Sequence, residues 1–260
     1  MTVQDQFVRR TFYSVFLAAA FVSVNPASGD DGYGSVAGQI VFEGRIPPRR
    51  VLVDREAVLK TVRPEEDVLD ESLLIDQESR GVANVFVWPD RVSSIHPRFK
   101  TRQAEAALLT FDGFRVGPHC LLMQTGQELR LRSVDGAVSN AFLRTWFNSG
   151  WNVLVPANGK DVSLQPFERN ERHPVEVTSN LQPWLRGWIK ISDHPYGALT
   201  DTRGNFQINW LPAGNYQFMI WHERANFVAK RLPVTVRDRK ITRLEGLTIT
   251  PKDVGIQAQR

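Results

Sequence analysis

The chain has 260 residues, of which 42% are hydrophobic and 23% charged, so it is long enough to bury one large core or two modest ones. Its 32 basic and 28 acidic residues give a formal net charge of +4, without a long basic run or an arginine-rich helix. This composition excludes a globally disordered chain and argues against nucleic acid as a partner.

The first 28 residues have the three parts of an export signal. Arg9 and Arg10 precede the apolar run TFYSVFLAAAFVSV, and small residues follow near PASG. The pattern predicts a signal peptide over 1–28 and an exported protein, periplasmic or extracellular, with no transmembrane domain in the mature chain. An uncleaved anchor is the alternative. RRTF is also similar to a twin-arginine signal, although Val8 and Tyr13 depart from that pattern.

The remaining sequence is a series of short alternating apolar segments, broken by Gly, Pro, Asn and Asp. Examples are SVAGQIVFEG, GVANVFVWP, ELRLRSVDG, GWIKISD, NYQFMIWHE and LPVTVRD. No helical stripe of twelve or more residues competes with them, so the pattern predicts an all-β protein of one sandwich or a pair of sandwiches.

Turns and links separate these segments. Reversals of the chain are predicted at Asn158-Gly159, at Gly204 and between Pro212 and Gly214. The acidic segment 63–72 is expected to be an exposed connection, and the Pro-broken segment 89–103 to be a link at a domain boundary.

Few residues suggest catalysis. There is no Gly-rich phosphate loop, no G-x-S-x-G, no H-E-x-x-H and no second cysteine beside Cys120, which we expect to be a small buried apolar group. Asp193/His194 and His222/Glu223 are adjacent pairs, and neighbours on a strand point to opposite faces. We therefore expect that the protein is not an enzyme.

The segment 106–197 resembles the cupredoxin-like domain of exported bacterial proteins related to methylamine utilisation or to plastocyanin. The resemblance lies in PH at 118–119, GQ at 126–127, PW at 183–184 and DHPY at 193–196. It implies a cupredoxin-like Greek-key β-sandwich over 106–193.

In that family a Cys, two His and a Met hold copper, and the resemblance places these ligand positions on Ser139, Ser179, Gln182 and Leu185. Hydroxyl, amide and alkyl groups do not replace the thiolate and imidazoles that suit both copper redox states. The resemblance therefore implies a degenerate site that does not bind copper, and no cofactor is expected.

A second segment, ALTDTRGNFQINWLPAGNYQFMIWHE, is similar to the carboxypeptidase regulatory-like, or starch-binding-like, immunoglobulin-like β-sandwich. It is too short for seven strands, so we expect a discontinuous sandwich of 34–100 with 194–250, into which the cupredoxin-like domain is inserted, and a tail over 251–260. An alternative partition gives the N-terminal strands to the cupredoxin-like domain.

Three of the five histidines, His119, His194 and His222, lie in motifs of these two families. If they meet between the sandwiches, they form an alternative metal site for copper or zinc with Glu223 or Asp193. The other reading is that each histidine bonds a neighbouring carbonyl or carboxylate and fixes a loop.

Seven tryptophans raise the question of carbohydrate binding. Strand-like alternation puts Trp88, Trp188 and Trp221 in cores. Candidates for a ligand surface are the loop residues Trp146 and Trp151 and, in the degenerate copper loop, Trp184.

The sequence thus favours an exported non-catalytic binding or structural protein, whose partner is an unidentified protein or a cell-surface polymer. A metal-binding or electron-transfer protein with a non-standard histidine site is the first alternative. A carbohydrate-binding module is the second.

Overall fold

The computed structural model describes residues 32–53, 67–100, 105–112, 114–134, 138–157 and 159–256. In these ranges the chain is almost entirely β, with one short helix, α1 Pro97–Lys100, so the prediction of an all-β protein built from sandwiches is confirmed. The expected signal peptide and Asn158 lie outside the described residues. Within the described part of the chain, no helix has the length and apolar character needed to cross a membrane.

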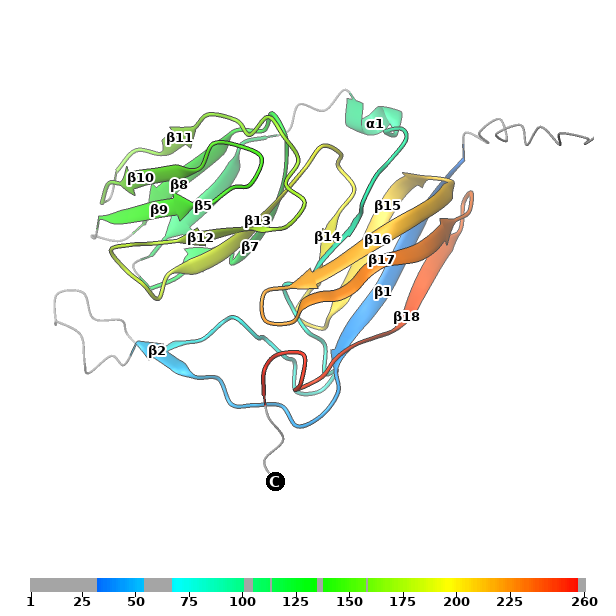
Figure 1. Cartoon of the computed structure of the whole chain (residues 1–260), viewed down its shortest axis with the longest axis horizontal. Helices are drawn as coiled ribbons and strands as arrows, with labels where there is room; N and C mark the ends of the chain where they lie inside the picture. Colours follow the sequence, from blue (N-terminus) through cyan, green and yellow to red (C-terminus); the bar gives the residue numbers. More distant parts are fainter. Residues whose placement is uncertain are drawn as a thin grey trace, which may run out of the picture. The chain divides into compact units, whose positions relative to one another are not determined.

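Strands from both ends of the described chain form one sandwich, here called the terminal sandwich (Figure 1). A sheet of order β15-β1-β18 faces a sheet of order β14-β4-β16-β17. The strands are β1 Tyr33–Phe42, β4 Phe86–Pro89, β14 Ala198–Leu199, β15 Asn205–Pro212, β16 Gly214–His222, β17 Asn226–Val236 and β18 Ile241–Ile249.

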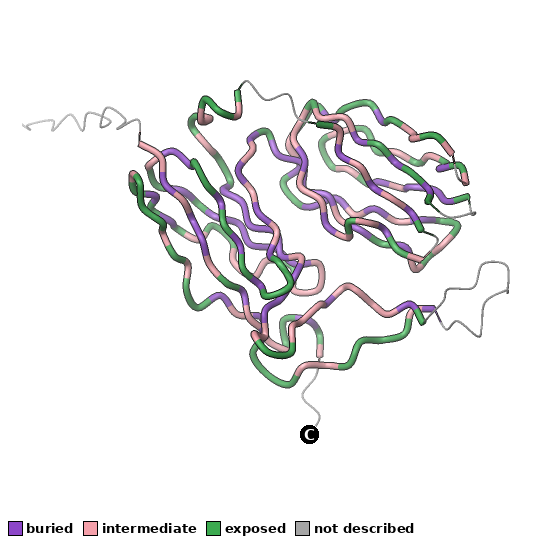
Figure 2. The backbone as a smooth tube through the Cα atoms, turned by 180° about the vertical axis from the view of Figure 1, so that it is seen from behind, coloured by how far each residue is buried: buried purple, intermediate pink, exposed green. Residues whose placement is uncertain are grey.

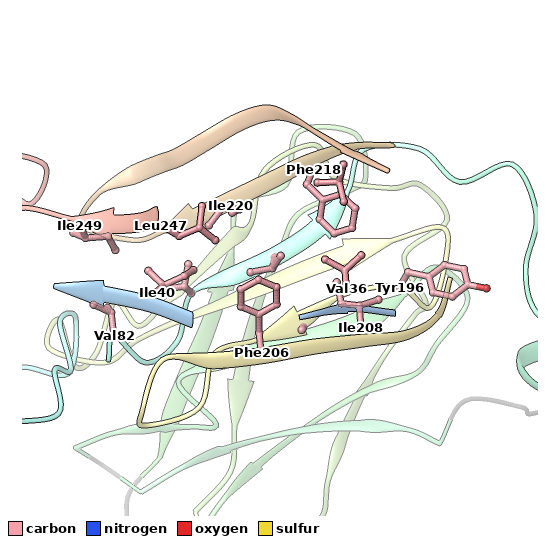
Figure 3. Close-up of a cluster of buried hydrophobic side chains, with 14 of the residues drawn as sticks. Val36, Ile40, Val82, Tyr196, Phe206, Ile208, Phe218, Ile220, Leu247 and Ile249 are labelled. Carbon is pink, nitrogen blue, oxygen red and sulfur yellow. The ribbon is translucent and has the colours of Figure 1, made fainter. Parts of the chain in front are cut away.

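The core of the terminal sandwich follows from alternation, because successive side chains of a strand point to opposite faces. Figure 3 shows Val36 and Ile40 of β1 among apolar side chains of the neighbouring and facing strands. The fully buried residues of this core include Ile40, Phe218 and Ile220. Each such side chain stabilises the fold by roughly 1.5–3 kcal/mol.

The strands between residues 107 and 192 form a second sandwich, here called the middle sandwich. Its sheets have the orders β10-β9-β12-β13-β7 and β11-β8-β5-β6, and each contains one parallel pair, β7 with β13 and β5 with β8. The strands are β5 Ala107–Phe111, β6 Val116–Gly117, β7 Cys120–Gln124, β8 Leu129–Ser133, β9 Ser139–Leu143, β10 Trp151–Val155, β11 Val162–Leu164, β12 Val175–Thr178 and β13 Arg186–Ser192. Alternating residues fill its own core, such as Leu129 and Leu131 of β8, while Arg130 and Arg132 stay exposed. Figure 2 shows this alternation as changes of colour along the strands.

A third apolar cluster joins the two sandwiches. Phe86 and Trp88 of β4 and Met219 and Trp221 of β16 pack with Cys120 of β7. The expected burial of Trp88, Trp221 and Cys120 is confirmed, whereas Trp188 is only partly buried beside this cluster.

Two expected connections are partly structured. The described end of the segment 63–72 forms β3 Val68–Leu69, which pairs with β2 Val51–Val53, and Val68 is only 4% exposed. The prediction of an exposed connection is therefore wrong for this end, because Val68 has apolar surface to bury. The predicted turn at Gly204 is confirmed, since its φ is 77° and a Cβ there would lie 2.2 Å from the carbonyl oxygen of Ile40.

The expected link 89–103 and tail 251–260 also contribute to the core. Ile95 and Phe99 pack against the terminal sandwich, and Val254 is buried in it. The prediction of a tail over 251–260 is therefore wrong for 251–256, because the side chain of Val254 is buried. Residues 257–260 lie outside the described residues.

We predict that Tyr216→Phe destabilises the protein by about 1 kcal/mol, the usual net contribution of one hydrogen bond. The buried Tyr216 hydroxyl donates to the carbonyl oxygen of Pro212 at 2.8 Å, and burial raises its pKa to about 12. Urea unfolding measures the change. Tyr33→Phe is the control, because no hydrogen bond of the Tyr33 hydroxyl occurs among the described residues; equal losses in both variants would contradict the prediction.

Candidate functional site

The four positions Ser139, Ser179, Gln182 and Leu185 lie together at one end of the middle sandwich. Ser139 begins β9, and the other three lie in the loop 179–185 between β12 and β13. The Ser139 hydroxyl donates to Oε1 of Gln182 at 2.7 Å, and the backbone N–H of Gln182 donates to Oγ of Ser179 at 3.1 Å. Leu185 is fully buried in the middle core, and its N–H donates to the carbonyl of Gln182.

Asn140 organises this loop. Its Oδ1 accepts hydrogen bonds from the Ser179 hydroxyl at 2.8 Å and from the backbone N–H groups of Asn180 and Leu181 at 2.9 and 3.1 Å. Its Nδ2 donates to Oδ1 of Asn152 on β10 at 3.0 Å. This role was not predicted from the sequence, although Asn140 directly follows Ser139.

The polar side chains of this cluster form hydrogen bonds with one another. Ser139 and Ser179 are 1% and 5% exposed, so their hydroxyls need the protein partners that they have. Two hydroxyls, an amide and an alkyl group do not fit copper, which is held by thiolate sulfur and imidazole nitrogen. The arrangement instead holds the loop 179–185 in one shape.

A second polar cluster lies between the two sandwiches. His119 of the middle sandwich binds Oε1 of Glu223 through Nε2, and Oε2 of Glu223 accepts from the indole Nε1 of Trp188 at 3.0 Å. The side chains of His119 and Glu223 are 11% and 5% exposed. A buried carboxylate of this kind is stable only because both its oxygens have partners.

The two partners shift each other's protonation. Burial acts to lower the pKa of His119, but the hydrogen bond and charge of Glu223 outweigh it, so this pKa is raised above its usual value. Burial acts to raise the pKa of Glu223, but His119 and Trp188 lower it below its usual value. His119 and Glu223 are therefore an ion pair in weakly acidic solution.

The three predicted histidines do not form one site. His222 is buried beside Glu223, its Nδ1 accepts from the backbone N–H of Arg224 at 3.3 Å, and burial lowers its pKa to about 4. The Nε2 of His194 lies 3.1 Å from the carbonyl oxygen of Pro89, which pairs with Phe218, four residues before His222.

This offset corresponds to roughly 13 Å along the strand. The expectation of a joint site is therefore wrong for His194, because its backbone contact holds it at another level of the sheet. No group of three or more His, Cys, Asp and Glu suited to a metal ion occurs among the described residues.

The three candidate tryptophans have different surroundings. Trp146 is 73% exposed, as predicted for a ligand surface. Trp151 was expected in a loop, which is wrong: it begins β10, pairs with Leu143 and packs against the middle core. Trp184 is partly buried, and its ring lies near that of Phe114, with centroids 6.4 Å apart and an angle of 14°.

The loop around Trp146 is held by a buried carboxylate that no sequence pattern indicated. Glu171 is 0% exposed, and its carboxylate accepts from the backbone N–H groups of Trp146, Phe147 and Asn148 at 2.9–3.3 Å. Its backbone carbonyl accepts from the ammonium group of Lys190 at 2.6 Å, and burial lowers the pKa of this lysine to about 8. Neither residue belongs to a motif, so only their contacts show these roles.

A cleft of about 620 Å³ opens next to both polar clusters. Its lining includes His119, Glu223 and Trp188, and also Trp184 from the loop 179–185. β2 and β3 contribute a further side. This volume lies in the range of small-molecule sites.

No family model matches the chain, and no curated protein matches it. Solved structures that are similar to it include amicyanin, a purple cupredoxin and a copper-containing nitrite reductase. A proline-to-glycine mutant of oxidised amicyanin is 9% identical over 40% of this chain and 91% of that one, with a TM-score of 0.29. A purple cupredoxin from Nitrosopumilus maritimus is 14% identical over 33% and 99%, with a TM-score of 0.28.

The copper-containing nitrite reductase from Thermus scotoductus SA-01 is 11% identical over 40% of this chain and 25% of that one, with a TM-score of 0.30. Likenesses at this level assign no activity to the chain.

We predict that His119→Gln lowers the free energy of unfolding more at about pH 5.5 than at about pH 8. A raised pKa makes the contribution of His119 fully present below its unfolded value, near 6.5, and removes it as the pH rises through the folded value. The pKa of Glu223 is lowered, so the stabilisation that its charge provides is fully present above its unfolded pKa, near 4.3. At pH 5.5 the contributions of His119 and Glu223 to the free energy of unfolding are therefore both present.

Urea unfolding at the two pH values measures this difference. The exposed His173 has a lowered pKa, so His173→Gln is the control, for which no larger loss at the lower pH is expected. Equal losses for His119→Gln at both pH values would show that the ion pair does not stabilise the fold.

Proposed function

We propose that this chain is an exported, non-catalytic binding protein in which a cupredoxin-like domain over 106–193 no longer uses type 1 copper. One observation carries the proposal: Ser139, Ser179, Gln182 and Asn140 satisfy one another by hydrogen bonds where the family resemblance places copper ligands. The loop 179–185 keeps a defined shape through these bonds and needs no metal to do so.

The domain partition is part of this proposal. The terminal sandwich is the immunoglobulin-like unit of 34–100 with 194–250, and the middle sandwich is inserted into it. The separate cores of the two sandwiches and the pairing of β1 with β15 and β18 support this partition. Export rests on the sequence of residues 1–28 alone.

We predict that the purified protein has neither stoichiometric copper nor a blue absorption band, and that a variant with four ligands restored gains both. The variant combines Ser139→His, Ser179→Cys, Gln182→His and Leu185→Met, which supply the thiolate, imidazoles and thioether that suit copper. Elemental analysis and visible absorption after copper addition measure the gain.

The matched control keeps Ser179 and carries the other three substitutions, so it has no thiolate and no blue band is expected. A blue, stoichiometric copper centre in the unaltered protein would reject the proposal. A four-ligand variant that folds but takes up no copper would show that these positions are not the equivalents of a copper site.

A second candidate function, carbohydrate binding, is favoured by Trp146. Its indole is 73% exposed, while three successive N–H groups of its loop are fixed by buried Glu171. A flat exposed ring on a fixed loop is suited to stacking on a sugar face.

We predict that, if this candidate function holds, Trp146→Ala abolishes binding to any polysaccharide that retains the unaltered protein in a pull-down assay. Trp210→Ala is the control, since Trp210 is 44% exposed on the terminal sandwich. Retention that is unchanged in Trp146→Ala, or no retention on any polysaccharide of a broad panel, would contradict this function.

A further inference from the structure

We propose that the cleft between the two sandwiches binds a small organic anion with a flat aromatic body. The proposal gives a ligand class to the binding function proposed above, and it rests on that function only in assuming that the protein binds a ligand. Whether the middle sandwich holds copper and whether the cleft holds an anion are measured separately.

The charge of the cleft favours an anion. Five arginines line it against three carboxylates, Asp70, Glu71 and Glu223, so positive charges exceed negative ones by two even before protonated His119 is counted. The arginines are Arg49, Arg50, Arg115, Arg186 and Arg224. This excess positive charge would repel a cationic ligand and attract an anionic one.

The three carboxylates already have partners within the protein. Glu223 binds His119 and Trp188. Glu71 lies 3.5 Å from the guanidinium group of Arg115, and Asp70 lies 3.3 Å from that of Arg50. These carboxylates are therefore poorly suited to bind a positively charged ligand.

Two arginines have capacity for a ligand. Arg224 donates to the carbonyl oxygen of Val254 at 2.7 Å, and no carboxylate lies within ion-pair distance of it among the described residues. Arg186 is half exposed and pairs at 2.9 Å with Glu176, which does not line the cleft. Such an exposed pair contributes little and leaves other N–H donors of the guanidinium group available, and a guanidinium group binds a carboxylate through two parallel hydrogen bonds.

Aromatic side chains supply the complement to a flat body. Trp188 and the nearly parallel rings of Phe114 and Trp184 line the same cleft. Trp184 belongs to the loop that Asn140 holds through the N–H groups of Asn180 and Leu181. A ligand with one acidic group and one or two fused rings fits both features and a volume of about 620 Å³.

Calorimetric titration with three probes separates the two features. The probes are 2-naphthoate, the uncharged 2-naphthamide and acetate, which has the charge without the rings. We expect 2-naphthoate to bind at least about tenfold more tightly than either of the others, and its affinity to fall as salt is raised.

Substitutions locate the binding. Arg186→Gln and Arg224→Gln are each expected to weaken 2-naphthoate at least about fivefold, because these two guanidinium groups have no carboxylate partner in the cleft lining. The melting temperature of Arg186→Gln is expected to stay unchanged, because its side chain is 53% exposed. Arg130→Gln is the matched control, since Arg130 is 45% exposed, pairs with Glu128 and lies outside the cleft. Arg186→Lys, which retains charge without the planar fork, tests the two-bond contact.

Equal affinity for 2-naphthamide, unchanged affinity in both arginine variants, or no binding of 2-naphthoate at millimolar concentration would each overturn the proposal. A copper-containing protein that nevertheless binds 2-naphthoate in this way would leave the anion site in place and remove only the copper-free function.

Discussion

The buried side-chain amide of Asn140 controls the geometry on which the candidate site depends. A carbonyl oxygen and an N–H₂ group removed from water need partners, and those of Asn140 come from Ser179, from two backbone N–H groups of the following loop and from Asn152. The loop is thereby tied to β9 and β10. In this loop, Leu185 packs in the core of the middle sandwich and Trp184 lines the cleft. Hydrogen bonds to Asn140 and the packing of Leu185 together give the loop its shape.

The same rule applies between the sandwiches. An apolar cluster of β4, β16 and β7 joins them, and Glu223 lies beside it with its charge balanced by His119 and its second oxygen bound to Trp188. Replacement of either partner would leave the other as an unpaired polar group in a largely dry environment. The lining of the cleft comes from residues of the middle sandwich, such as Trp188, and from residues outside it, such as Glu223 of the chain after β16.

The parts of this structure that depend on local pattern could be predicted from the sequence. Alternation within LRLRS predicts a half-buried strand, and β8 has that burial pattern. Gly204 marks a turn because no Cβ fits beside Ile40. The family resemblance brought Ser139 and Gln182, 43 residues apart, to one place, and their side chains are in contact. Contacts without a motif could not be predicted in this way.

The pairing of His119 with Glu223 spans 104 residues, and buried Glu171 and Lys190 look like ordinary surface charges in the sequence. Trp151 was misplaced because its polar neighbours masked the start of a strand. His194 was misplaced because its partner is a backbone carbonyl, which every residue has.

The parallel pairing of β1 with β18 also sets an order of events during synthesis. Among the described strands β1 is the earliest in the chain, yet its neighbour on one side of the sheet is made about 200 residues later. The middle sandwich draws its strands from a continuous stretch and is able to close while translation goes on. Among the described strands, β1 therefore completes its sheet only after β15 and β18 have been made, and until then Val36, Ile40 and Phe42 lack most of the core that buries them.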